Sequence, residues 1–134
     1  MESSAEVIRE LKEKEETGVL WKTCCDILRA VTILHGSAWD SDLEGILTEL
    51  WYMKELGADR IEVFRKKIKD ALKFLNEKGV VASQKKLRAD LSKPYATEEN
   101  MHTAKDFVTL LREFGGDKDV IRYRREIMGY HWRP

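Results

Sequence analysis

Cysteine and proline are scarce in this chain of 134 residues. Its only two cysteines, Cys24 and Cys25, are adjacent, and its only two prolines are Pro94 and Pro134. Adjacent cysteines on one helix point about 100° apart, and a bond between them would strain the backbone. We therefore expect no disulfide framework. The absence of disulfides predicts a protein of the reducing cytoplasm. The late prolines permit helix almost everywhere before residue 90.

Membrane, enzyme and metal signals are also lacking. No apolar run approaches the roughly 20 residues that cross a bilayer, and the acidic start of the chain is unlike a secretory signal. No Gly-rich phosphate loop, G-x-S-x-G or H-E-x-x-H motif occurs. The histidines at positions 35, 102 and 131 lie far apart, and the cysteines lack metal-binding spacing. We therefore expect no enzyme activity, cofactor, metal or membrane partner, and only a pH-sensing role of His102 stays open.

Glutamine and asparagine are scarce, with one and two copies, while charged residues reach 36%. This bias favours a thermophilic source. The net charge is zero, but it is unevenly distributed. Residues 1–59 carry 6 basic and 13 acidic side chains, residues 60–93 carry 11 and 4, and residues 94–134 carry 7 of each. A protein with such a cationic segment can dock a polyanion with one face.

Apolar residues at three- and four-residue steps predict helices over residues 4–16, 18–34, 42–56 and 60–78. Ser3 and Ser41 each precede a Glu by three residues, which is the spacing of a capping box. Gly57 is expected to end the third helix in the left-handed conformation, and Asp59 to cap the fourth. Gly79 is expected to end the fourth helix.

A different pattern begins at Val80. The segment "VVASQKKLR" alternates and predicts a strand over residues 80–88, with a short second strand near Tyr95 and Ala96 completing a hairpin. Thr97 is expected to cap a fifth helix that runs to Phe114, and a last helix is expected after Asp117. The expected fold class is mainly α with a small two-stranded β-hairpin, in a single domain.

This order of elements resembles the winged helix-turn-helix family. The likeness is carried by "LTELWYMKELGADRIEVFRKKIKDALKFLNEKGVV" followed by "ASQKKLRADLSKPYAT". With helices on both sides of the wing, the chain is similar to MarR-like and PadR-like transcriptional regulators. The resemblance implies an N-terminal helix in residues 1–17, a winged core in 18–97 and flanking dimerisation helices in 98–134. It also implies a cytoplasmic regulator that binds double-stranded DNA as a homodimer.

The chemistry of the basic segment agrees with that implication. On a helical wheel, Arg65, Lys66, Lys69 and Lys73 fall within about 100° of one another, beside the apolar arc. A helix fits the major groove of DNA, where such a stripe can reach phosphates, and arginine can read guanine. The candidate DNA-binding residues are Arg60, Arg65, Lys66, Lys69, Lys73, Lys85, Lys86, Arg88 and Lys93.

Two alternatives stay open. Arg122, Arg124 and Arg125 could grip nucleic acid, but aromatic and apolar neighbours favour a subunit interface. The candidate dimerisation residues are Val120, Tyr123, Ile127, Met128, Tyr130 and Trp132. The competing function is a winged-helix module that binds other proteins in a larger assembly.

Overall fold

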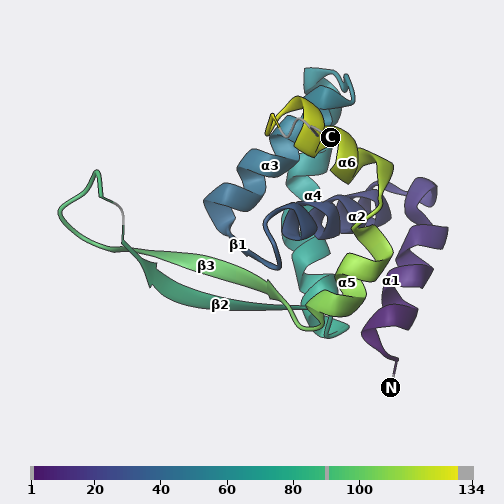
Figure 1. Ribbon diagram of the computed structural model, residues 1–134, viewed down its shortest axis with the longest axis horizontal. Helices are drawn as coiled ribbons and strands as arrows, with labels where there is room; N and C mark the ends of the chain where they lie inside the picture. The colour runs from purple at the N-terminus through teal and green to yellow at the C-terminus, as the bar shows by residue number, and fades with distance from the viewer. Residues whose placement is uncertain (1, 90, 130–134) are drawn as a thin grey trace, which may run out of the picture.

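The protein is mainly helical, with a small three-stranded antiparallel sheet, in a computed structural model that describes residues 2–89 and 91–129 (Figure 1). The hairpin β2–β3 extends from the helical body to one side. The described elements are α1 (Ser4–Glu13), a 3-10 turn η1 (Glu15–Thr17), α2 (Val19–Ile33), β1 (Ser37–Trp39), α3 (Asp40–Met53), α4 (Ala58–Glu77), β2 (Val81–Arg88), β3 (Thr97–Ala104), α5 (Phe107–Phe114) and α6 (Lys118–Glu126).

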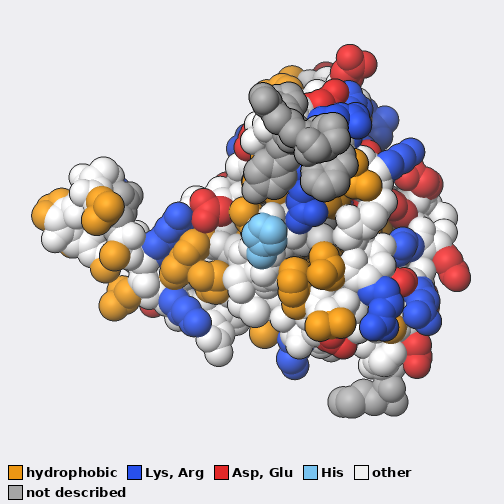
Figure 2. Space-filling model, viewed as in Figure 1, with side chains coloured by type: hydrophobic (Ala, Val, Ile, Leu, Met, Phe, Trp, Pro, Cys, Tyr) orange, Lys and Arg blue, Asp and Glu red, His pale blue; other side chains and the backbone are white. Residues whose placement is uncertain are grey.

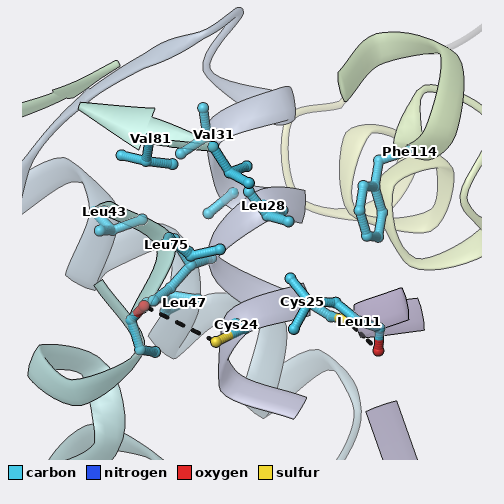
Figure 3. Close-up of a cluster of buried hydrophobic side chains, with 14 of the residues drawn as sticks. Leu11, Cys24, Cys25, Leu28, Val31, Leu43, Leu47, Leu75, Val81 and Phe114 are labelled. Carbon is cyan, nitrogen blue, oxygen red and sulfur yellow. Dashed lines mark hydrogen bonds between the residues drawn. The ribbon is translucent and has the colours of Figure 1, made fainter. Parts of the chain in front are cut away.

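Helix α2 is the centre of the core. Every residue from Thr23 to Ile33 is buried, and the helix contacts α1, α3, α4, α5 and α6. Cys24 and Cys25 are both fully buried, where Cys24 Sγ faces Ala71 O and Cys25 Sγ faces Leu11 O (Figure 3). Burial raises the pKa of both thiols to about 12. Core packing of Cys24 is confirmed, and Cys25 is more buried than expected.

The sheet order is β1-β3-β2, so β3 pairs with both neighbours. The sequence predicted helix over this segment, and that prediction is wrong. Residues 97–104 pair along their whole length with β2, from Val81 opposite Ala104 to Arg88 opposite Thr97. Side chains of β3 that point toward the helices, such as His102 and Ala104, are buried, while Thr103 between them is exposed. Strand pairing on both edges outweighs the helical spacing of its apolar residues.

Strand β1 was also missed, so the sheet has three strands rather than two. Only three residues long, it pairs Ala38 with His102 in β3. Because β1 runs directly into α3, that helix begins at Asp40, and Ser41 lies inside its first turn instead of capping it. The Ser3 cap is confirmed, since its Oγ accepts the Glu6 amide at 3.2 Å.

Three helices end in the same way, in a Schellman motif with a left-handed residue after the last turn. After α4, Gly79 has φ 72° and Val80 N donates to Leu75 O, which confirms the predicted stop. After α2 and α3, the left-handed residues are His35 and Glu55, both with φ 60°. The predictions for Gly57 and Asp59 are wrong, because Gly57 has φ −68° at the start of α4 and Asp59 lies within its first turn.

A buried ionic cluster fastens α6 and η1 to the core. The Arg29 guanidinium, 7% exposed, donates to Glu15 and Asp26 through Nη1 at 2.5 and 2.8 Å, and to Asp117 through Nε at 3.1 Å. Lys54 Nζ lies 2.9 Å from Asp119. Burial alone would raise the pKa of Glu15, but hydrogen bonds from Arg29 and Lys22 outweigh it and lower that pKa to about 2.

Beside this cluster, Ile33, Leu50, Met53, Val120 and Tyr123 form a second apolar cluster that packs α6 against α2 and α3. Burial and the nearby Glu49 carboxylate raise the pKa of Tyr123 to about 12. In the described residues, no helix combines the length and apolar character needed to cross a membrane.

Candidate nucleic-acid interface

The outer side of α4 carries exposed cations that form no ion pair with the described residues. We call Arg65, Lys66, Lys69 and Lys73 the basic face. Within residues 2–89 and 91–129 none of these four forms an ion pair, whereas neighbouring Lys67 lies 3.9 Å from Asp70. The opposite side of α4 is fixed in the core by Ile61, Phe64, Ala71 and Leu75. Apolar anchoring on one side therefore holds the charged side toward solvent.

Arg60 is separated from the basic face. It lies in the first turn of α4, with its guanidinium 5.9 Å from the Phe64 ring. There it lines a cavity of about 490 Å³ with η1 and the start of α2. The structure thus places the four cations of the basic face on one side of α4, but it directs Arg60 elsewhere.

The hairpin holds three further exposed lysines. Lys85 and Lys86 are consecutive in β2, so their side chains leave opposite faces of the strand. Lys85 shares a small pocket with Asp40 and Asn100, while Lys86 pairs in register with Glu99. Lys93 lies in the turn at the far end. The hairpin cations are therefore distributed over two faces and the tip.

Arg88 is held within the chain. Its guanidinium lies 3.2 Å from Asp42 and 3.5 Å from Glu99, donates to Ser41 Oγ at 2.8 Å, and lies over the Trp39 ring at 5.3 Å. The hydrogen bond from Ser41 is the main reason that the pKa of Glu99 is lowered, and Arg88 adds to it. Arg88 thus fastens the hairpin to α3. Its guanidinium, which the sequence analysis predicted to contact DNA, already has partners within the chain.

A groove of about 630 Å³ separates α4 from the hairpin, and we call it the hairpin groove. Lys69 and Lys73 of the basic face line one wall, and the partly buried side chains of Ile68 and Leu72 contribute apolar surface. Acidic side chains are present as well. The groove is lined by Asp40, Ser41, Glu44, Ile68, Lys69, Leu72, Lys73, Asn76, Glu77, Ser83, Glu99, Asn100 and His102.

A chain of hydrogen bonds joins four of the side chains that line this groove. His102, only 3% exposed, bonds Asp40 Oδ1 through Nε2 at 2.5 Å and Ser83 Oγ through Nδ1 at 2.6 Å. Asn76 Nδ2 donates to Ser83 Oγ at 2.9 Å, and the Ser83 amide donates to Asn76 Oδ1 at 3.0 Å. We call these four residues the His102 chain. It joins α3, α4, β2 and β3 at the base of the hairpin.

The sequence could not have revealed the His102 chain. Asp40 and His102 are 62 positions apart, and His102 falls in a segment that was predicted to be helical. Only the unexpected pairing of β1 and β2 with β3 brings these residues together. Buried polar side chains need partners, but the sequence does not say which.

Residues predicted to form a subunit interface are separated by the fold. Val120 and Tyr123 are buried inside the chain, in the second apolar cluster, so their surfaces are already used. Ile127 and Met128 are 39% and 37% exposed and are accessible to a partner. The other two predicted residues, Tyr130 and Trp132, lie outside the described residues.

The described residues hold no group of three or more His, Cys, Asp or Glu side chains arranged to bind a metal ion. Comparison of the chain with models of protein families, with curated proteins and with solved structures gives no match. The geometry of α4, the hairpin and the groove between them is therefore the basis on which a function is inferred.

Proposed function

We propose that this protein is a winged-helix protein that binds double-stranded DNA, with α4 as the helix that enters the major groove. The observation that carries the proposal is the basic face: four exposed cations on one side of one helix without carboxylate partners in the described chain. Unmatched surface cations repel one another, and a polyanion relieves that repulsion while releasing counterions.

The arrangement of elements supports the same proposal. Helices α3 and α4 are joined by the short turn at residues 54–57, as in a helix-turn-helix motif. The hairpin β2–β3 follows α4 directly, and β3 lies between β1 and β2. With strands of eight residues, the hairpin is roughly 26 Å long, enough to reach DNA backbone beside the groove that α4 would enter.

Charge reversal on α4 tests the proposal. Lys69→Glu together with Lys73→Glu should abolish retardation of a random duplex at low salt, because two favourable phosphate contacts become repulsive. The matched control, Lys105→Glu with Lys118→Glu, changes the net charge equally at exposed lysines outside the interface. Far-ultraviolet circular dichroism should show unchanged helix content in both variants. Equal DNA affinity of the two double variants would refute the assignment of α4.

A second candidate function, binding of another protein, is favoured by the end of the hairpin. Leu91 is fully exposed, and Leu87 and Tyr95 are 73% and 63% exposed, so apolar side chains gather there far from the core (Figure 2). Exposed apolar clusters mark surfaces that contact a partner. A mobility shift separates the candidates: absence of retardation at low salt favours the protein partner, and salt-sensitive retardation favours DNA.

We further propose that the protein acts as a homodimer through its C-terminal segment, with Ile127 and Met128 among the contacts. A dimer would present two copies of α4 to two half-sites. Light scattering at several protein concentrations measures the mass directly, and a monomer at every concentration would refute this part of the proposal.

A further inference from the structure

The hairpin groove contains a histidine whose protonation would change what the groove can bind. Asp40 can only accept hydrogen bonds when ionised, so His102 Nε2 carries the hydrogen of that contact. In the neutral ring Nδ1 is then an acceptor, and the Ser83 hydroxyl must donate to it. The hydrogen of Ser83 is thereby engaged by His102 and is not offered to a ligand.

Protonation reverses the contact between His102 and Ser83. Both ring nitrogens then donate, so Ser83 Oγ accepts from His102 Nδ1 and from Asn76 Nδ2. The hydroxyl hydrogen of Ser83 is displaced and becomes available to an acceptor in the groove that this side chain lines. No hydrogen bond of the His102 chain needs to break, so the change requires little movement of the fold.

The charge of the groove changes at the same time. The charged groups that line the groove together with His102 are Asp40 and Glu44 of α3, Lys69, Lys73 and Glu77 of α4 and Glu99 of β3. Lys85 and Glu98 line a smaller pocket beside it. Arg88 already compensates Glu99. Among the remaining charged groups on the groove walls, the carboxylates of Asp40, Glu44 and Glu77 outnumber the two lysines by one. A positive charge on His102 cancels that excess of negative charge.

We propose that the hairpin groove is a proton-linked phosphate subsite, in which an anionic oxygen is bound by Lys69, Lys73 and the Ser83 hydroxyl once His102 is protonated. The inference rests on the proposed function, because it identifies this phosphate as part of the DNA backbone. Linkage is reciprocal: protonation of His102 strengthens anion binding, and anion binding makes His102 harder to deprotonate. Unperturbed histidines change charge between about pH 5 and pH 8, and this sets the pH range of the test.

Calorimetry tests the linkage on the unmodified protein. Titration with a random duplex of about 20 base pairs, near pH 6.5 in buffers of different ionisation enthalpy, measures protons taken up on binding. We expect net uptake, and an affinity that rises about fivefold or more between about pH 7.5 and pH 5.5. His102→Gln should remove the uptake, and Ser83→Ala should reduce it. His35→Asn, at an exposed histidine in a left-handed turn, should retain it.

Binding of the duplex without proton uptake would overturn the subsite and leave the DNA-binding proposal standing. Failure to bind the duplex at all would overturn the DNA-binding proposal, and a second measurement then tests the subsite alone. Nuclear magnetic resonance can follow the titration of the His102 ring protons in inorganic phosphate and in chloride at equal ionic strength. An upward shift of the midpoint in phosphate supports the subsite, and an unchanged midpoint overturns it.

Discussion

The buried cluster around Arg29 and the basic face of α4 use the same kinds of charged residue in opposite ways. Arg29 is 7% exposed and lies within hydrogen-bonding distance of three carboxylates. Each cation of the basic face is exposed and forms no ion pair with the described residues. A charge removed from water must be matched inside the chain, whereas an exposed charge is solvated and stays available to a partner. The difference separates charge that stabilises this fold from charge that can bind.

The hairpin lies between these two extremes. Arg88 is 32% exposed and matched by Asp42 and Glu99, while Lys85, Lys86 and Lys93 are exposed. The matched residue fixes the hairpin to α3, and the lysines remain on its surface. A charge-rich segment can therefore contribute to both structure and recognition, residue by residue.

The largest expected effect comes from breaking the buried cluster. Arg29→Met should lower the free energy of unfolding by about 3–5 kcal/mol, because it leaves buried carboxylates without their main partner. Urea denaturation followed by circular dichroism measures the loss. The control is Arg9→Met, whose exposed pair with Glu113 at 3.4 Å should contribute at most about 1 kcal/mol. Equal losses in the two variants would remove the distinction between the two kinds of charge.

Acid should weaken the same cluster by a smaller amount. The pKa of Glu15 falls from its ordinary 4.5 to about 2 on folding. Its contribution to stability is therefore complete above about pH 4.5 and is lost as the pH falls toward about 2, a change of about 3 kcal/mol. Urea midpoints measured from about pH 6 downward should fall accordingly. In Glu15→Gln the part of this decline due to Glu15 should be missing, and an identical pH profile would contradict the assignment.

The smallest effect is expected on the basic face, where it concerns binding rather than stability. Lys69→Gln with Lys73→Gln should leave the unfolding free energy within about 0.5 kcal/mol of the wild type, since both side chains are exposed. The same variant should reduce the slope of log affinity for duplex DNA against log salt by about 2. Mobility shifts over a salt series measure the slope. A clear loss of stability would mean that these lysines are structural after all.

Local sequence pattern was sufficient for much of the helical framework. The apolar stripe of α4, its end at Gly79 and the start of β2 follow from spacing within about twenty residues, and all were predicted. The charges that became the basic face also follow from the wheel, because an anchored apolar arc fixes where the opposite arc points. Arg60 lies nearer the edge of the buried arc, which is why the structure separates it from the basic face.

Contacts between residues that are far apart in the sequence could not be predicted from such local patterns. The segment 97–104 has helical spacing, yet it forms β3 because two strands pair with it. The pairing also places His102 next to Asp40 and Ser83, and it brings Arg88 to Asp42. The partners are 19, 62 and 46 positions apart in the sequence, and their identity depends on the strand register.

The sequence by itself determined which helix sides are apolar, where the glycine stop falls and that positive charge collects between residues 60 and 93. Only the tertiary structure decided which of those charges are neutralised internally and which are left on the surface. The reason is that hydrophobic periodicity acts between near neighbours along one element, whereas ion pairs, strand register and buried hydrogen bonds depend on which elements meet after folding.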